Sequence, residues 1–133
     1  MKKILWLVVL VVSVGAYYLL VGKDGTLQVS LKEQNSSGES GTAILKEVDG
    51  KVQVTLTVAG QPAGVVQPVH IHEGTCAELG TVVYPLAFPK DGVASVTLLA
   101  VSLADLKTQV PLAVNAHKSG QEPHVYVACG DIA

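Results

Sequence analysis

TAILKEVDGKVQVTLTVA, residues 42–59, consists of two strand-like runs on either side of Asp49-Gly50. In the second run, apolar residues alternate with polar ones, which is typical of a strand with one buried face. The apolar positions are Val52, Val54, Leu56 and Val58. Asp-Gly between two such runs predicts a type I′ turn, because both central residues of that turn need a positive φ. Residues 42–59 therefore predict an antiparallel β-hairpin.

Short strand-like runs continue on both sides of this hairpin. A polar loop (34–41) and a Pro- and Gly-rich loop (60–68) separate several of them. One short helix is expected to begin at Ser102 as its cap, with Asp105 reaching back, and to end before Pro111. Seven or eight short strands predict an all-β, Greek-key, immunoglobulin-like β-sandwich over residues 25–133. The further strand-like runs are 27–31, 69–73, 81–88, 93–101, 112–117 and 124–129.

An apolar segment precedes this domain. Residues 4–21, ILWLVVLVVSVGAYYLLV, form 18 positions without a charge. As a helix the segment would be about 27 Å long, close to the hydrocarbon thickness of a bilayer. The alternative is a cleaved signal peptide with Val14-Gly15-Ala16 as its cleavage site, although the apolar run continues past that site. We predict that residues 1–24 are a retained signal-anchor, a single transmembrane helix.

The flanking charges predict an orientation. Lys2 and Lys3 precede the apolar segment, whereas Lys23 after it is offset by Asp24. The positive-inside rule then places the N-terminus in the cytoplasm of a single-pass inner-membrane protein. Residues 25–133 would be periplasmic or extracellular, in an oxidising compartment where disulfides persist.

The chain has two cysteines, Cys76 and Cys129, both in the predicted outer domain. A bridge between them would close a loop of 53 residues. In the chain-entropy model such a loop stabilises the fold by roughly 4 kcal/mol. Two separate buried thiols are the alternative, and the oxidising compartment favours the disulfide.

Charge makes one class of partner unexpected. Residues 25–133 carry six Lys and ten acidic residues, and the chain has no Arg. Binding of nucleic acid needs clustered Lys and Arg to neutralise phosphates, so no nucleic-acid partner is expected. The expected partners are the lipid bilayer and other integral membrane subunits. Ser13, Gly15 and Ala16 would give the anchor a small-residue patch for packing against another helix.

Two segments around the cysteines carry a family resemblance. HIHEGTC (70–76) and ACGDIA (128–133) resemble the signature segments of the copper/zinc superoxide dismutase fold. VVYPL (82–86) and VNAH (114–117) are similar to chordin-type (CHRD) domains, which share that sandwich. The resemblance covers about residues 65–133. It implies a dismutase-like β-sandwich and the same Cys76–Cys129 bridge.

The histidines are the candidate metal ligands. His70 and His72 are two apart on a strand, so they share one face about 7 Å apart and can approach one ion. Imidazole suits copper or zinc. The resemblance implies copper, with His117 as a third ligand. Solvent-facing histidines without a metal are the alternative.

Three further residues are weaker candidates for this site. His124 is a possible fourth ligand, but strict alternation from 124 to 129 turns it away from the Cys129 side, and its loop-edge position favours exposure. Glu73 and Glu122 are candidates for hydrogen-bonding the imidazoles, with exposed carboxylates as the more common case.

The sequence departs from the dismutases in two ways. Their further histidines after the first cysteine, which complete the zinc site, have no counterpart, because residues 76–114 contain no His. Their arginine three residues before the final cysteine is replaced by Tyr126. A negatively charged domain without Arg lacks steering for an anionic substrate. Efficient superoxide dismutation is therefore not expected, and no catalytic residue is assigned.

The sequence is compatible with three functions. The first is a membrane-anchored, non-enzymatic copper-binding module with His70, His72 and His117 as ligands. The second is a single-span accessory subunit of a larger membrane complex, without a metal. The third is a degenerate superoxide dismutase. Metal analysis of the purified protein discriminates between the first two.

Overall fold

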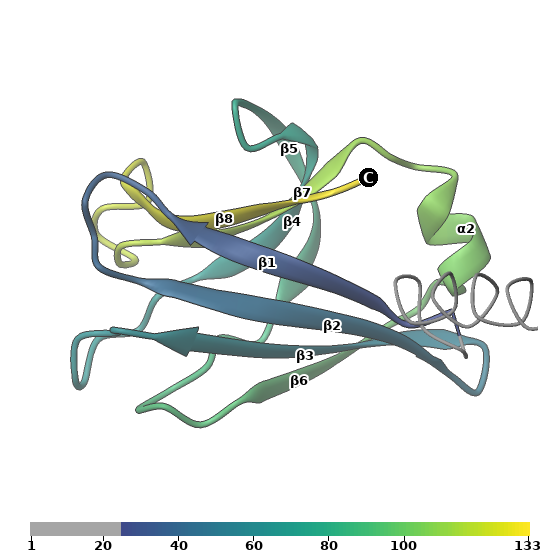
Figure 1. Ribbon diagram of the computed structural model, residues 1–133, viewed down its shortest axis with the longest axis horizontal. Coiled ribbons are helices and arrows are strands. Elements are labelled where there is room, and N and C mark those ends of the chain that lie inside the picture. Colours follow the sequence, from purple (N-terminus) through teal and green to yellow (C-terminus); the bar gives the residue numbers. More distant parts are fainter. Residues whose placement is uncertain (1–24) are drawn as a thin grey trace, which may run out of the picture.

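A computed structural model describes residues 25–133 of the chain (Figure 1). The predicted anchor, residues 1–24, lies outside the described residues. Within residues 25–133, no helix has the length and apolar character that crossing a bilayer requires. The described elements are β1 (Leu27–Glu33), β2 (Ser40–Val48), β3 (Lys51–Ala59), β4 (Val69–Thr75), β5 (Glu78–Leu86), β6 (Ser95–Leu99), α2 (Leu103–Lys107), β7 (Leu112–His117) and β8 (Tyr126–Ile132).

The strands form one curled antiparallel sheet in the order β5-β4-β7-β8-β1-β2-β3-β6. β1 joins its two halves. Residues 27–31 of β1 pair with β2, whereas Lys32 and Glu33 pair with β8. The sheet bends at this junction, so that the two halves cover a common core in a sandwich-like arrangement (Figure 1). The predicted all-β class is confirmed.

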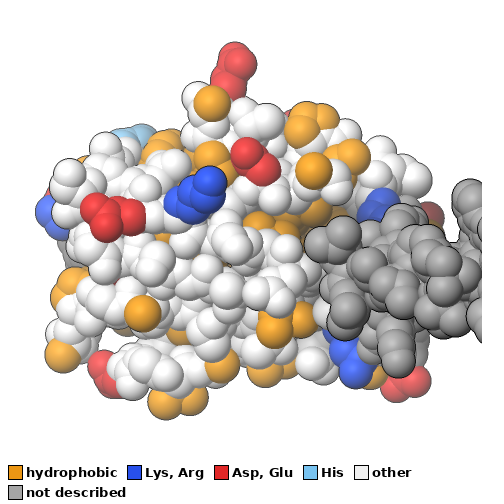
Figure 2. Space-filling model, in the orientation of Figure 1, with side chains coloured by type: hydrophobic (Ala, Val, Ile, Leu, Met, Phe, Trp, Pro, Cys, Tyr) orange, Lys and Arg blue, Asp and Glu red, His pale blue; other side chains and the backbone are white. Residues whose placement is uncertain are grey.

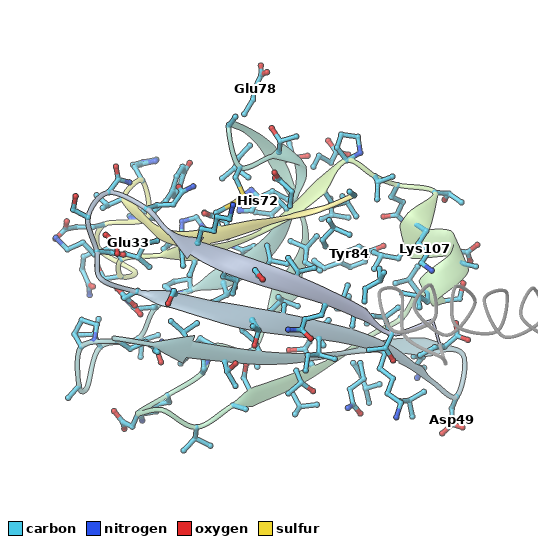
Figure 3. The ribbon with its side chains drawn as sticks, in the orientation of Figure 1. Glu33, Asp49, His72, Glu78, Tyr84 and Lys107 are labelled. Carbon is cyan, nitrogen blue, oxygen red and sulfur yellow. A yellow bond between two sulfur atoms is a disulfide. The ribbon has the colours of Figure 1, made fainter. Side chains whose placement is uncertain are left out.

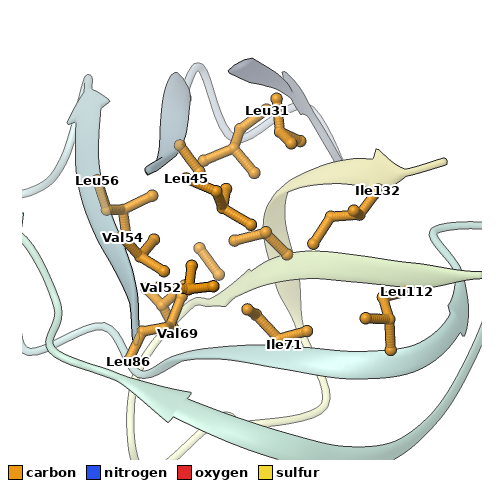
Figure 4. Close-up of a cluster of buried hydrophobic side chains, with 14 of the residues drawn as sticks. Leu31, Leu45, Val52, Val54, Leu56, Val69, Ile71, Leu86, Leu112 and Ile132 are labelled. Carbon is orange, nitrogen blue, oxygen red and sulfur yellow. The ribbon is translucent and has the colours of Figure 1, made fainter. Parts of the chain in front are cut away.

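Both halves of the sheet contribute side chains to the core (Figure 4). The buried face of β3 is the one that the alternation predicted, since Val52, Val54, Leu56 and Val58 are all buried. β4 and β7 supply Ile71, Val114 and other apolar residues from the opposite half. Every second residue of β4 and β7 is thereby directed inward, and the intervening residues face away from the core.

The turn chemistry predicted from the sequence is present at two places. Asp49 and Gly50 have φ values of 51° and 74°, as a type I′ turn requires, and β2 and β3 pair without a register shift. Ser102 caps α2, its side chain accepting a hydrogen bond from the Asp105 backbone N–H at 3.1 Å. β8 extends beyond the expected end at residue 129, because Gly130 and Ile132 continue to pair with β7.

Candidate metal centre

Two adjacent antiparallel strands, β4 and β7, position the three candidate ligands. In β4, Val69 and Ile71 enter the core, so His70 and His72 lie on the other face. In β7, Val114 and Ala116 enter the core and His117 lies on the same outer face as the β4 histidines. The local alternation of both strands therefore brings together residues 47 positions apart in the chain.

The three imidazoles converge. Ring centroids are 4.9 Å apart for His70 and His117, and 5.6 Å apart for each pair that includes His72. His70 Nδ1 lies 3.0 Å from His117 Nε2. One nitrogen from each ring lies within 4.8 Å of the other two. An ion bound at about 2.0–2.1 Å needs ligand nitrogens no more than about 4.2 Å apart, so a small side-chain rotation suffices.

Two backbone carbonyls set the orientation of the rings. His72 Nδ1 lies 3.1 Å from the Gly80 carbonyl oxygen, and His117 Nδ1 lies 2.6 Å from that of Pro123. Because a carbonyl only accepts, both Nδ1 atoms carry the proton and donate it. His72 Nε2 is then left with a free lone pair, which is the form that binds a metal. His117 Nε2 accepts a hydrogen bond from His70 Nδ1, and a bound ion would take the place of that proton.

The predicted partners of these rings, Glu73 and Glu122, are engaged elsewhere. Glu73 Oε2 accepts a hydrogen bond from Thr81 Oγ1 at 3.0 Å. Glu122 forms an ion pair with Lys118 at 3.1 Å. The imidazoles of His72 and His117 instead donate to backbone carbonyls, those of Gly80 in β5 and of Pro123 in the loop after β7. Such acceptors have no residue signature in a sequence.

Burial favours the neutral form of His70 and His117. His72 and His117 are both 6% exposed, and His70 is half-buried. Desolvation lowers the pKa of His70, and the neighbouring His117 and His72 lower it further. Desolvation also lowers the pKa of His117, although its hydrogen bond to Pro123 acts in the opposite direction. His72 Nε2 is buried and has no hydrogen-bond partner among the described residues. A buried lone pair of this kind fits a metal ion.

His124, the possible fourth ligand, is exposed and does not belong to the group of three. Tyr126, two residues further on, contacts the site, with its ring 5.4 Å from that of His117. The strict alternation expected from residue 124 to 129 was wrong. A register shift between Ala116 and His117 interrupts the pairing, and Val127 and Ala128 both enter the core. This bulge turns Tyr126 toward the histidines.

The predicted disulfide is confirmed. Cys76 and Cys129 are bonded, with Cα atoms 5.9 Å apart. Cys129 pairs with Asn115 of β7, and Asn115 pairs with His70 of β4, so the bridge lies beside the histidine cluster. Figure 3 shows His72 and the disulfide in the same part of the molecule. The Cys76 N–H also donates to Asp131 Oδ1 at 2.7 Å, so a hydrogen bond links the Cys76 and Cys129 segments in addition to the disulfide.

In comparisons with known proteins, no family model, no curated protein and no solved structure matches this chain. The resemblance to dismutases and CHRD domains therefore stays a prediction from the sequence. The geometry defines a class of site, namely a half-buried group of three imidazoles able to hold one metal ion. Nitrogen-only donors of this kind suit copper or zinc better than calcium or magnesium.

Proposed function

We propose that this protein is a membrane-anchored, extracytoplasmic copper-binding module of the dismutase-like or CHRD type, without enzyme activity. One observation carries the proposal. His72 Nε2 is buried without a partner among the described residues, and the His72 ring lies 5.6 Å from the rings of His70 on the same strand and His117 on the adjacent one. Burying an unpaired acceptor is costly, and a bound ion would remove that cost.

The ring orientations favour a metal site over a chance cluster. Ligand histidines in metal sites typically donate their other ring N–H to a carbonyl or carboxylate. His72 and His117 do so through Gly80 and Pro123. Copper, rather than zinc, is proposed because residues 70–76 and 114–117 resemble copper-binding segments of the dismutases and CHRD domains. When bound, copper would supply a one-electron redox centre or a transferable cargo ion.

Three features argue against dismutation. The zinc-site histidines of the dismutases have no counterpart between residues 76 and 114. The position of their arginine is occupied by Tyr126, whose ring packs against His117 and adds no positive charge. A domain with four more acidic than basic residues also repels superoxide rather than attracting it. The residual-dismutase hypothesis is therefore the weakest of the three.

A copper titration of the full-length chain tests the proposal. We expect one tight site in the wild type, lost in a His70→Ala/His72→Ala variant and kept in the control His124→Ala, which removes an exposed histidine outside the cluster. At a hundredfold excess of copper over Kd, linkage predicts about 2.7 kcal/mol of stabilisation. Thermal unfolding should show it in the wild type and control only.

Equal copper affinity in the wild type and the double variant would remove the site. Superoxide consumption above that of free buffer, lost in the double variant, would instead favour the degenerate dismutase. Circular dichroism of each metal-free variant checks that the sheet is retained, so that loss of binding is not loss of folding.

The accessory-subunit hypothesis has one structural observation in its favour. β6 ends the strand order, and Val96 and Leu98 on it are 56% and 58% exposed. Separate apolar side chains are exposed along the lower margin of the molecule, where β6 lies (Figures 1 and 2). An exposed apolar edge strand is a ready surface for pairing with another chain. Isolation of the native protein without metal, in fixed ratio with an integral membrane partner, would favour this alternative.

A further inference from the structure

A polar residue, Asn115, lies next to the histidine cluster on the sheet. Asn115 lies on β7 between Val114 and Ala116, both of which enter the core, so its side chain is on the outer face with that of His117. It pairs with His70 on one side and with Cys129 on the other. Its exposed fraction is 0%. Asn115 is thus enclosed between the histidines and the disulfide.

Neither polar atom of this amide has a partner. Asn115 Oδ1 and Nδ2 are both buried and unbonded among the described residues, as is His72 Nε2. His72 pairs with Ala113, two residues from Asn115 on the same strand, so the two side chains are diagonal neighbours on one face. Three unsatisfied polar atoms therefore gather at one small region. Native proteins rarely bury such groups without a use for them.

An ion at this site would lie close to the sheet, where the side-chain oxygen of Asn115 can serve as a ligand atom. The His70 atom that faces His117 is Nδ1, the ring nitrogen nearer to the backbone. An ion bound there is held close to the sheet. The side-chain oxygen of asparagine is also a δ atom, at a similar distance from its own backbone. Because His70 and Asn115 are directly opposite on neighbouring strands, both δ atoms can face the same point.

We propose that Asn115 is a fourth ligand-bearing residue of the metal centre, with its side-chain carbonyl oxygen facing the ion held by His70, His72 and His117. The inference rests on the proposed copper function. Amide oxygens serve as weak axial ligands in copper sites. A hard oxygen donor favours Cu(II) over the softer Cu(I), so Asn115 biases the site toward the oxidised ion.

The test compares Asn115→Val and Asn115→Asp with the wild type as full-length chains, using competitive titrations with Cu(II) and Cu(I) and electron paramagnetic resonance of the Cu(II) form. For Asn115→Val we expect Cu(II) affinity to fall about tenfold. Cu(I) affinity should stay unchanged and the Cu(II) spectrum should shift. The metal-free variant should unfold at a higher temperature, because an unpaired buried amide has been removed. Asn115→Asp, which replaces the amide by a carboxylate, should bind Cu(II) more tightly than the wild type.

Two results would overturn the assignment. One is wild-type Cu(II) affinity and an unchanged spectrum in both variants. The other is an equal loss of Cu(I) and Cu(II) binding together with a lower unfolding temperature, which is the signature of a purely structural residue. The His70→Ala/His72→Ala variant separates this from failure of the proposed function. If that variant loses copper while both Asn115 variants match the wild type, the histidine site stands and only the role of Asn115 is rejected.

Discussion

At the scale of single residues, the titration of His70 and His117 gives the metal-free protein a pH dependence. Burial lowers the pKa of both rings below 6.5, so the folded protein binds fewer protons than the unfolded chain as the pH falls below that value. Their contribution to stability is complete above about pH 6.5 and is lost as the pH falls toward the folded pKa values. We expect the free energy of unfolding to decrease over this window.

Urea unfolding of the metal-free protein between pH 5 and 8 measures this effect. A His70→Gln/His117→Gln variant should show a flatter profile. His124→Ala removes only the smallest of the charge effects that lower the pKa of His117, so it should change the slope much less. The carboxyl of Glu39 changes the free energy of unfolding with pH in the opposite direction. Its side chain is 3% exposed, and burial raises the pKa of its carboxyl, which costs stability as the pH rises above about 4.5. An unchanged slope in the double glutamine variant would show that the two rings do not titrate as their burial requires.

The residues of the site differ in how far the sequence could predict them. The spacing of His70 and His72 places both on one face from local geometry alone. His117 lies on a distant strand, and only the family resemblance indicated it. Strict alternation over residues 124–129 would turn Tyr126 away from the Cys129 side, and the bulge in the pairing of β8 with β7, which places it beside His117, cannot be predicted from alternation. Asn115 is a polar residue in the apolar run LAVNAH, but nothing in the sequence indicates that it lies beside the histidines.

At the scale of elements, the β4–β5 hairpin connects the disulfide to the metal centre. Its turn carries Cys76, and its second strand carries the Gly80 carbonyl that accepts from His72. Register shifts on both sides of His72 make the hairpin irregular. At Gly74, φ is +91° and an added Cβ would lie 2.3 Å from the Glu78 carbonyl oxygen, so only glycine fits there.

Removing the disulfide should therefore have two effects. A Cys76→Ser/Cys129→Ser variant should lose roughly 4 kcal/mol of unfolding free energy, because its unfolded chain is no longer constrained. Its copper affinity should fall as well, since the Gly80 carbonyl is held less firmly against His72. Urea unfolding and copper titration, the latter under conditions where the variant is folded, measure the two effects separately.

Asp131→Ala is the matched control for this prediction. It removes the 2.7 Å hydrogen bond to the Cys76 N–H and leaves the covalent bridge intact. We expect it to lose no more than about 1–3 kcal/mol and to keep its copper affinity. A folded Cys76→Ser/Cys129→Ser variant with wild-type copper affinity would show that the hairpin holds Gly80 in place without the bridge.

At the scale of the whole molecule, the sequence predicted the individual strands better than their partners. The β2–β3 hairpin follows from its own turn, because Asp49-Gly50 determines which strands meet. The pairings of β1 with β8 and of β4 with β7 join segments far apart in the chain, and alternation specifies only which face is buried. The order of the strands around the curled sheet therefore could not be predicted from the sequence and is seen only in the structure.

The disulfide and the apolar N-terminal segment together predict where the molecule lies. A Cys76–Cys129 bridge persists in an oxidising compartment, which agrees with residues 25–133 being outside the cytoplasm. Residues 4–21 are long enough to cross a bilayer, and Lys2 and Lys3 favour a cytoplasmic N-terminus.

We therefore expect the native protein to stay with the membrane fraction through an alkaline wash. In intact spheroplasts, a protease added from outside should remove the β-sandwich, and mass spectrometry of the untreated protein should detect a peptide from residues 1–24. A bilayer-crossing helix resists extraction because about 18 apolar side chains would have to enter water, whereas a peripheral protein held by charge is released.

A mature chain that begins at Tyr17 would instead identify the segment as a signal peptide, with Val14-Gly15-Ala16 as its cleavage site, and would leave the copper site on a released domain.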